Sequence, residues 1–146
     1  MKNKSRIFDS SDLDEVSLRK LICKAAKMFG VSRVVFNNKA KYVRGTYNCS
    51  TGVLFLDTKQ EKTEMLGTFF HELGHHFAVK NKRWKAYHFD LVPSMKVDRI
   101  FNIENKVDGY AKKLWNKHVN SKQWGKYKYC YPKSQKTAIM NTLFNR

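Results

Sequence analysis

Cysteine is scarce in this chain of 146 residues, and its three cysteines lie far apart. Cys23, Cys49 and Cys130 form neither the even-numbered framework of a disulfide-stapled domain nor the CxxC pairs of a zinc knuckle. This usage fits a reducing compartment. Met1–Arg6 leads into polar sequence without an apolar signal core, and no stretch is long enough to span a bilayer. We therefore expect a cytoplasmic protein with no membrane partner.

Acidic residues are also few, since 12 Asp and Glu stand against 29 Lys and Arg, a formal net charge of +17. This excess indicates either an anionic partner, such as nucleic acid, or only a lysine-rich, solvated surface. Hydrophobic residues make up 42% of the chain and aromatic residues 14%, which excludes a disordered polypeptide. The length suits one core. We expect a single domain over 1–146, with a basic lead-in at 1–10 and a basic, aromatic extension at 119–146.

Hydrophobic spacing predicts an α+β fold that begins with a helix and continues with strands. Apolar residues recur at helical spacing after Ser11, where acidic residues fill the first turn, and Gly30 is a natural stop. Short β-branched and aromatic runs bounded by turn residues then predict three strands. We expect these strands to form a small, mostly antiparallel sheet, over residues 31–36, 42–47 and 53–56.

Two long helices are predicted after the sheet. The first covers about 62–79 and carries an apolar stripe at steps of four, three and four: Leu66, Phe70, Leu73 and Phe77. The second covers about 97–118 and includes Glu104 within its own apolar stripe. A shorter helix is expected near 139–144, whereas Pro93 argues against a continuous helix before the second long one.

The first long helix carries the motif His71-Glu72-Leu73-Gly74-His75. Two histidines four residues apart project from nearly the same side of a helix, so both can reach one tetrahedral zinc ion. Glu72 lies beside them, where a carboxylate can take a proton from a metal-activated water. The motif therefore predicts a Zn²⁺ site with Glu72 as the catalytic base. Gly74 is unfavourable inside a helix and predicts the close approach of another backbone.

A catalytic zinc site needs a third protein ligand and an open position for water. Glu104 is the strongest candidate, because it stands between Ile100 and Val107 in an apolar stripe where an unpartnered carboxylate would be costly. Asp108, one turn further on, could hydrogen-bond the far nitrogen of a ligating histidine. The alternative is that Glu104 sits at a helix edge and pairs with a lysine. Rival ligands without this stripe argument are His88, Asp98 and His118.

The two motifs together resemble the gluzincin pattern, HExxH followed by ExxxD. More closely, the chain resembles the ImmA/IrrE family of small bacterial and phage metallopeptidases over about residues 50–115. Val53–Leu56 matches the short strand that precedes the HExxH helix in that family, and Tyr110-Ala111 matches an aromatic-alanine pair. Lys106 and Val107 depart from the residues usual in the family, which leaves the subfamily open.

The resemblance implies a zincin-like fold and a zinc-dependent endopeptidase that cleaves a repressor or a similar regulatory protein. By position, it implies that His71, His75 and Glu104 bind zinc and that Glu72 is the base. The predicted organisation is then an N-terminal helix, a small sheet, the HExxH helix and a second metal-ligand helix.

Further site residues are predicted around the zinc. A strand at a sheet edge over the cleft could pair with an extended substrate, although it could equally be a core strand; its residues are Val53, Leu54, Phe55 and Leu56. Four side chains could donate a hydrogen bond to an oxyanion: Tyr87, His88, Tyr110 and His118. Packing is the commoner role for each of them. We expect His76 to lie at the surface or to support a ligand.

Two other functions stay open. A DNA-associated protease would resemble the SprT-like proteases, which usually take a histidine as third ligand, here His88 or His118. Its motivation is the net charge and the alternation of aromatic and basic residues over 124–131, which suits single-stranded nucleic acid, although the same pattern could close the core. The third possibility is a non-catalytic, basic binding or inhibitor protein that keeps zinc for stability.

Overall fold

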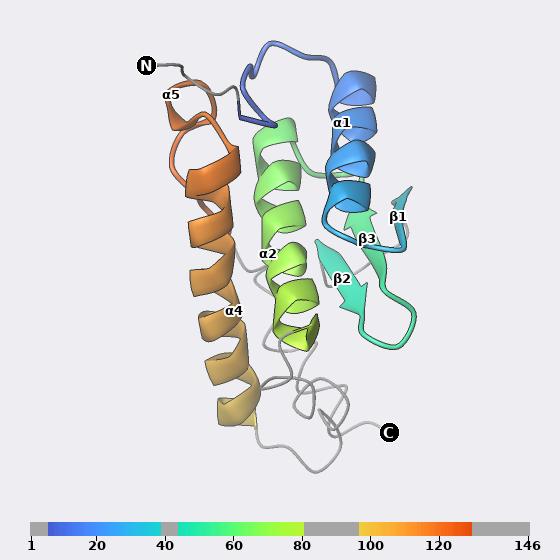
Figure 1. Cartoon of the computed structure of the whole chain (residues 1–146), viewed down its shortest axis with the longest axis vertical. Helices are drawn as coiled ribbons and strands as arrows, with labels where there is room; N and C mark the ends of the chain where they lie inside the picture. The colour runs from blue at the N-terminus through green and yellow to red at the C-terminus, as the bar shows by residue number, and fades with distance from the viewer. Residues whose placement is uncertain (1–5, 39–43, 81–96, 130–146) are drawn as a thin grey trace.

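The computed structural model describes three stretches of backbone, residues 6–38, 44–80 and 97–129. It describes side chains over the same stretches except at 79, 80 and 97–105. Within these ranges the chain is α+β, with four helices and a three-stranded mixed sheet (Figure 1). The helix predicted near 139–144 lies outside the described residues.

Helix α1 spans Glu15–Met28 and begins later than the predicted start at Ser11. The reason is Asp14, whose carboxylate accepts a hydrogen bond of 2.7 Å from the amide of Ser17 and so caps the first turn. Gly30 has a φ of 86°, and its amide and the next one bond back to carbonyls of the last turn. The predicted stop at Gly30 is therefore confirmed.

The sheet has the order β1-β3-β2, with β1 at Arg33–Asn37, β2 at Gly45–Asn48 and β3 at Val53–Asp57. Strand β3 pairs in parallel with β1 and antiparallel with β2. The prediction of a mostly antiparallel sheet is therefore wrong. A tight turn joins β2 to β3, which makes this pair antiparallel. Strand β1 is not joined directly to β3, because the chain first crosses to β2 at the opposite edge of the sheet and then returns through β3 in the direction of β1.

Helices α2 (Lys62–Lys80) and α4 (Val97–His118) confirm both predicted long helices. Figure 1 shows α2 in the middle of the molecule, with α4 on one side and α1 and the sheet on the other. Every residue from 65 to 76 is buried. The single apolar stripe predicted for this helix therefore understates its burial, because neighbours cover α2 all round. A short helix, α5 (Ser121–Trp124), follows α4 and was not predicted.

An aromatic cluster joins the N-terminal segment to α2 and α4. The Phe8 ring is fully buried and lies 6.2 Å from the Phe69 ring and 5.7 Å from the Phe70 ring, measured between centroids. The Phe70 ring lies 5.7 Å from that of Trp115. The amide of Phe8 also donates to the carbonyl of His118. The predicted lead-in at 1–10 thus contributes a core residue at Phe8.

Helices α2 and α4 touch at Gly74. A Cβ placed on Gly74 would lie 2.7 Å from the Val107 carbonyl oxygen and 2.9 Å from Val107 Cγ1. Only glycine leaves room for this contact, so the predicted close approach at Gly74 is confirmed. It brings the motif-bearing part of α2 directly against α4.

Replacing Gly74 by alanine should lower the free energy of unfolding by about 1–3 kcal/mol, because the added methyl group collides with backbone that cannot move independently. The matched control is Gly109→Ala in α4, where a Cβ meets nothing within 4 Å. That variant should gain up to about 1 kcal/mol from helix propensity. Urea unfolding measures both, and equal stabilisation in the two variants would contradict the close contact.

Candidate metal centre

The middle of α2 carries an unusual set of buried polar side chains. None of them is more than 9% exposed, and they are Thr68, His71, Glu72, His75 and His76. A buried polar group needs a hydrogen-bond partner or a cation, because its desolvation is otherwise costly. The neighbours of each side chain therefore indicate what it can do.

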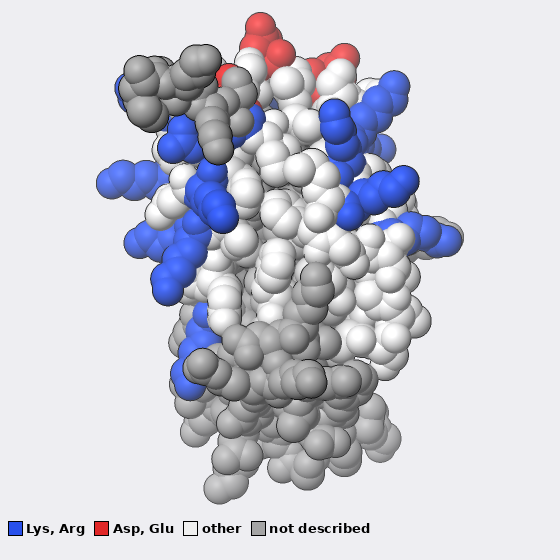
Figure 2. Space-filling model, viewed as in Figure 1, with Lys and Arg blue, Asp and Glu red and all other residues white. Residues whose placement is uncertain are grey.

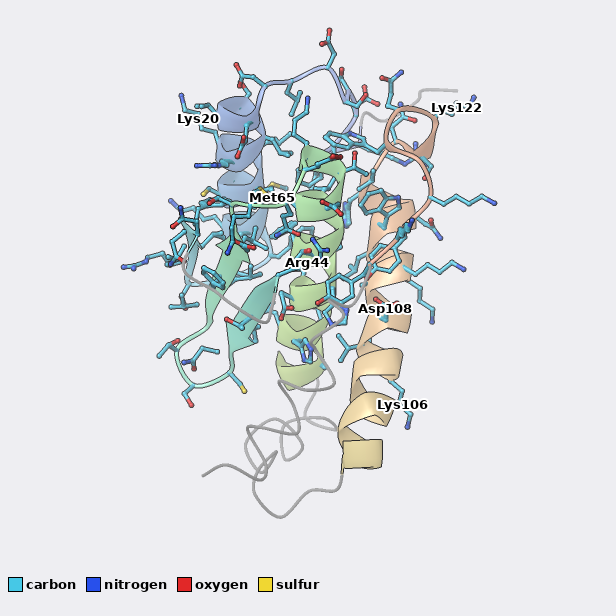
Figure 3. The ribbon with its side chains drawn as sticks, turned by 180° about the vertical axis from the view of Figure 1, so that it is seen from behind. Lys20, Arg44, Met65, Lys106, Asp108 and Lys122 are labelled. Carbon is cyan, nitrogen blue, oxygen red and sulfur yellow. The ribbon has the colours of Figure 1, made fainter. Side chains whose placement is uncertain are left out.

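His71 is 1% exposed, and its Nδ1 lies 3.0 Å from the Oδ1 of Asp108. Asp108 is labelled on α4 in Figure 3. An ionised carboxylate can only accept a hydrogen bond, so the proton of this pair sits on Nδ1 of His71. In the neutral ring, Nε2 is then the nitrogen that carries the lone pair. The hydrogen bond expected between Asp108 and a histidine of the motif is therefore present, with His71 as the donor.

His75 stands one helical turn after His71, and the two ring centroids are 5.3 Å apart at an interplanar angle of 77°. Glu72 lies between them in sequence and is 5% exposed. A Cβ placed on Gly45, at the start of β2, would lie 3.3 Å from Glu72 Cγ, so Glu72 borders the edge of the sheet. Two adjacent buried imidazoles, one of them fixed by a carboxylate, fit the nitrogen donors that zinc prefers.

The third ligand is not fixed by the described side chains. Among them, no group of three or more histidine, cysteine, aspartate or glutamate residues is placed to hold a metal ion. Positions 104 and 98 belong to α4, but the side chains of Glu104 and Asp98 lie outside those described, and His88 lies outside the described residues altogether. His118 ends α4, ten residues or about 15 Å of helix beyond Asp108.

His76 is 5% exposed, so the expectation of a surface position is wrong. Its Nδ1 lies 2.8 Å from the hydroxyl of Tyr47 on β2, and its Nε2 lies 2.9 Å from the carbonyl oxygen of Phe29 after α1. The carbonyl can only accept, so Nε2 carries the proton and Nδ1 accepts from Tyr47. His76 therefore ties α1, α2 and β2 together.

The predicted substrate strand at Val53–Leu56 forms part of β3, the central strand. Because β1 and β2 occupy both of its edges, β3 cannot pair with a further chain. Of the two possibilities given for Val53–Leu56, the structure supports the core strand and not the edge strand. Strand β2 is the edge strand beside α2, since Gly45 adjoins Thr68 and Glu72. A pocket of about 190 Å³ opens next to it, lined by Arg44, Thr63, Glu64, Thr68 and Lys128.

In the described part of the chain, no oxyanion candidate is placed at the His71–His75 pair. Tyr110 is two residues from Asp108 and hence about 160° away round α4. His118 lies at the end of α4, and burial lowers the pKa of its imidazole, with a smaller contribution from Lys117. Tyr87 and His88 lie outside the described residues.

Sequence reasoning missed two tyrosines in the predicted extension at 119–146. The hydroxyl of Tyr127 donates a hydrogen bond to Asp108 Oδ1, the atom that also accepts from His71. The Tyr129 ring stacks on the His71 ring, with centroids 4.0 Å apart and an interplanar angle of 8°. The only sequence signal was the alternation of aromatic and basic residues over 124–131, one interpretation of which was closure of the core.

Comparisons with family models, with curated proteins and with solved structures find no match to this chain. No helix in the described part of the chain is both long enough and apolar enough to cross a membrane.

Replacing Tyr47 by phenylalanine should lower the free energy of unfolding by about 1–3 kcal/mol, because it leaves the buried Nδ1 of His76 without a donor. In a His76→Leu background the same change should have a much smaller effect, since the unsatisfied acceptor is gone. Urea denaturation of the four proteins measures the coupling. Additive effects would show that Tyr47 and His76 do not interact.

Proposed function

We propose that this chain is a zinc-dependent endopeptidase of zincin-like fold, and that it cleaves a regulatory protein partner. The observation that carries the proposal is the hydrogen bond from His71 to Asp108. It keeps a proton on Nδ1 of a buried imidazole, so that Nε2 is the ring nitrogen whose lone pair could bind a metal, one turn from a second buried imidazole on His75.

Glu104 would complete the ligand set with His71 and His75. It stands four residues before Asp108 on α4, and helical periodicity puts positions four apart on nearly the same side. Val107, three residues after position 104, contacts α2 at Gly74, next to His75 in sequence. The side of α4 that includes position 104 therefore adjoins the HExxH segment, which supports Glu104 over His118.

Zinc held by these residues would supply Lewis acidity, which brings the pKa of a bound water near 7. Glu72 is buried beside the two histidines and is not needed as a ligand, so its carboxylate can accept a proton from the attacking water and return it to the leaving amine. The peptide C–N bond breaks, and the water oxygen remains on the new carboxyl group.

Strand β2 is better placed than β3 to hold the substrate. One edge of β2 pairs with β3, and its Gly45 end lies against Thr68 and Glu72 of α2. An extended peptide that pairs with the other edge of β2 would run alongside the α2 segment that contains Glu72. The substrate class this favours is a protein segment that can adopt an extended conformation.

A second observation favours an anionic partner in addition. Residues 106–129 contain one acid, Asp108, which is bonded to His71 and Tyr127, and seven exposed lysines: Lys106, Lys112, Lys113, Lys117, Lys122, Lys126 and Lys128. Figure 2 shows basic side chains along the α4 side of the molecule, and Figure 3 shows Lys106 and Lys122 projecting outward from it. We propose that this basic face binds the phosphate backbone of nucleic acid and localises the protease there.

Glu72→Gln should abolish peptide hydrolysis while zinc binding persists, because the amide cannot accept a proton yet keeps the shape of the side chain. Cleavage of a library of quenched fluorescent peptides with added Zn²⁺ measures the activity. Glu61→Gln, an exposed change of the same kind just before α2, is the matched control and should stay active. Wild-type protein that binds zinc without hydrolysing any peptide would favour the non-catalytic alternative.

Reversing Lys106, Lys113 and Lys117 to glutamate should weaken binding to duplex DNA at 50 mM salt and flatten its salt dependence. Each lost phosphate contact lowers the slope of log K against log[salt] by about 0.9. The control reverses three exposed lysines of α1, Lys20, Lys24 and Lys27. An equal loss in both variants would indicate net charge rather than a defined face, and no binding by the wild type would rule the partner out.

A further inference from the structure

The chain after α5 crosses back over the metal-binding part of α2. Gly125 has a φ of 87° and turns the chain, and its carbonyl accepts a hydrogen bond of 3.1 Å from the indole of Trp115. The Trp115 ring also lies 5.7 Å from the Tyr127 ring, between centroids. Because Trp115 is itself fully buried in the core, the segment 125–129, here named the strap, has a rigid anchor.

The backbone of the strap lies directly on α2. A Cβ placed on Gly67 would collide with the carbonyl oxygen of Lys128. Gly67 and Gly74 are seven residues apart and so lie on nearly the same side of α2, with His71 between them. The strap approaches α2 at Gly67 and helix α4 approaches at Gly74, so backbone comes close on both sides of the His71 turn.

The two tyrosines of the strap act on the His71–Asp108 pair from different directions. Tyr127 donates to the Oδ1 of Asp108, whose side chain is 31% exposed in the structure. Tyr129 covers one face of the His71 ring by parallel stacking at 4.0 Å. Together they fix the orientation of the carboxylate and the plane of the imidazole.

We infer that Tyr127 and Tyr129 are positioning residues for the metal centre, and that the strap is a required part of it. This inference rests on the proposed function. A ring held by Asp108 and by stacking presents Nε2 in one direction, so less conformational freedom is lost when a metal binds. Neither tyrosine has to touch the metal or the substrate for this role.

The direct test is Tyr127→Phe, which removes one hydroxyl and leaves the ring that packs on Trp115. Zinc affinity, measured by competition with a chromophoric chelator, should fall about tenfold, the lower end of the loss typical for groups that support a metal ligand. Lys126→Ala, which changes only an exposed side chain of the same strap, is the control and should bind zinc as the wild type does. Unchanged affinity in Tyr127→Phe overturns the inference.

A second readout does not depend on zinc. In metal-free protein at pH 8, ¹⁵N NMR of the imidazoles should show His71 as the Nδ1-protonated tautomer, because Asp108 can only accept. In Tyr127→Phe, the Nε2-protonated form of His71 should appear alongside it, whereas His76, which is held elsewhere, should keep its own tautomer. A pure Nδ1 tautomer in both proteins overturns the role of Tyr127.

Gly67→Ala tests the strap as a whole, since its methyl group displaces Lys128 and with it both tyrosines. It should lower zinc affinity more than Tyr127→Phe does, in protein whose far-ultraviolet circular dichroism shows that it is folded; wild-type affinity would contradict a required strap. If the wild type binds no zinc, the proposed function fails, and the tautomer measurement still decides whether the strap positions His71.

Discussion

The structure depends on the enclosure of one helix. Helix α2 is covered by α1, by the sheet, by α4 and by the strap, so residues 65 to 76 have little solvent to satisfy their polar groups. Desolvation therefore forces each polar side chain of the motif to find a partner on a neighbouring element. His71 is met by Asp108 of α4, and His76 by Tyr47 of β2 and the chain end of α1. The metal site proposed here would be one more solution to the same requirement.

Glycine makes this enclosure possible at its closest points. A methyl group would collide with a neighbour at each of three glycines. At Gly67 the neighbour is the strap, and at Gly74 it is α4. At Gly45 the methyl group would collide with Thr68 of α2 and with the backbone of β3. Two of these glycines lie inside a helix, where each costs about 1 kcal/mol relative to alanine. The gain is that α4 and the strap come close enough to contact His71, through the Asp108 hydrogen bond and the Tyr129 ring. The two helical glycines lower the intrinsic stability of α2, and in return they allow neighbouring elements to pack closely around its polar side chains.

Much of the fold could be predicted from the local spacing of apolar residues, because this spacing shows which face of a helix or strand is buried. The bounds of α2 and α4 and the stop at Gly30 follow from hydrophobic period and capping chemistry, and Gly74 predicted the contact with α4. Strand order could not be predicted, since β-branched runs do not encode which strand lies in the centre.

The partners of His71 were only half predictable. Asp108 follows from helical spacing, but Tyr127 and Tyr129 reach the site through a turn at Gly125 that no periodicity describes. Burial of His76 was missed because one helix can be enclosed by elements distant in sequence.

The central claim is that His71 and His75 on α2 and Glu104 on α4 bind one zinc ion. Titration of the metal-free protein with Co²⁺ tests it most directly, because the visible d–d absorption of cobalt reports both stoichiometry and coordination geometry. We predict one equivalent per chain with the strong absorption of a four-coordinate site, and a lost or much weakened band in folded Glu104→Ala protein. A wild-type protein that gives no such band, or a Glu104→Ala variant with an unchanged spectrum and affinity, would contradict it.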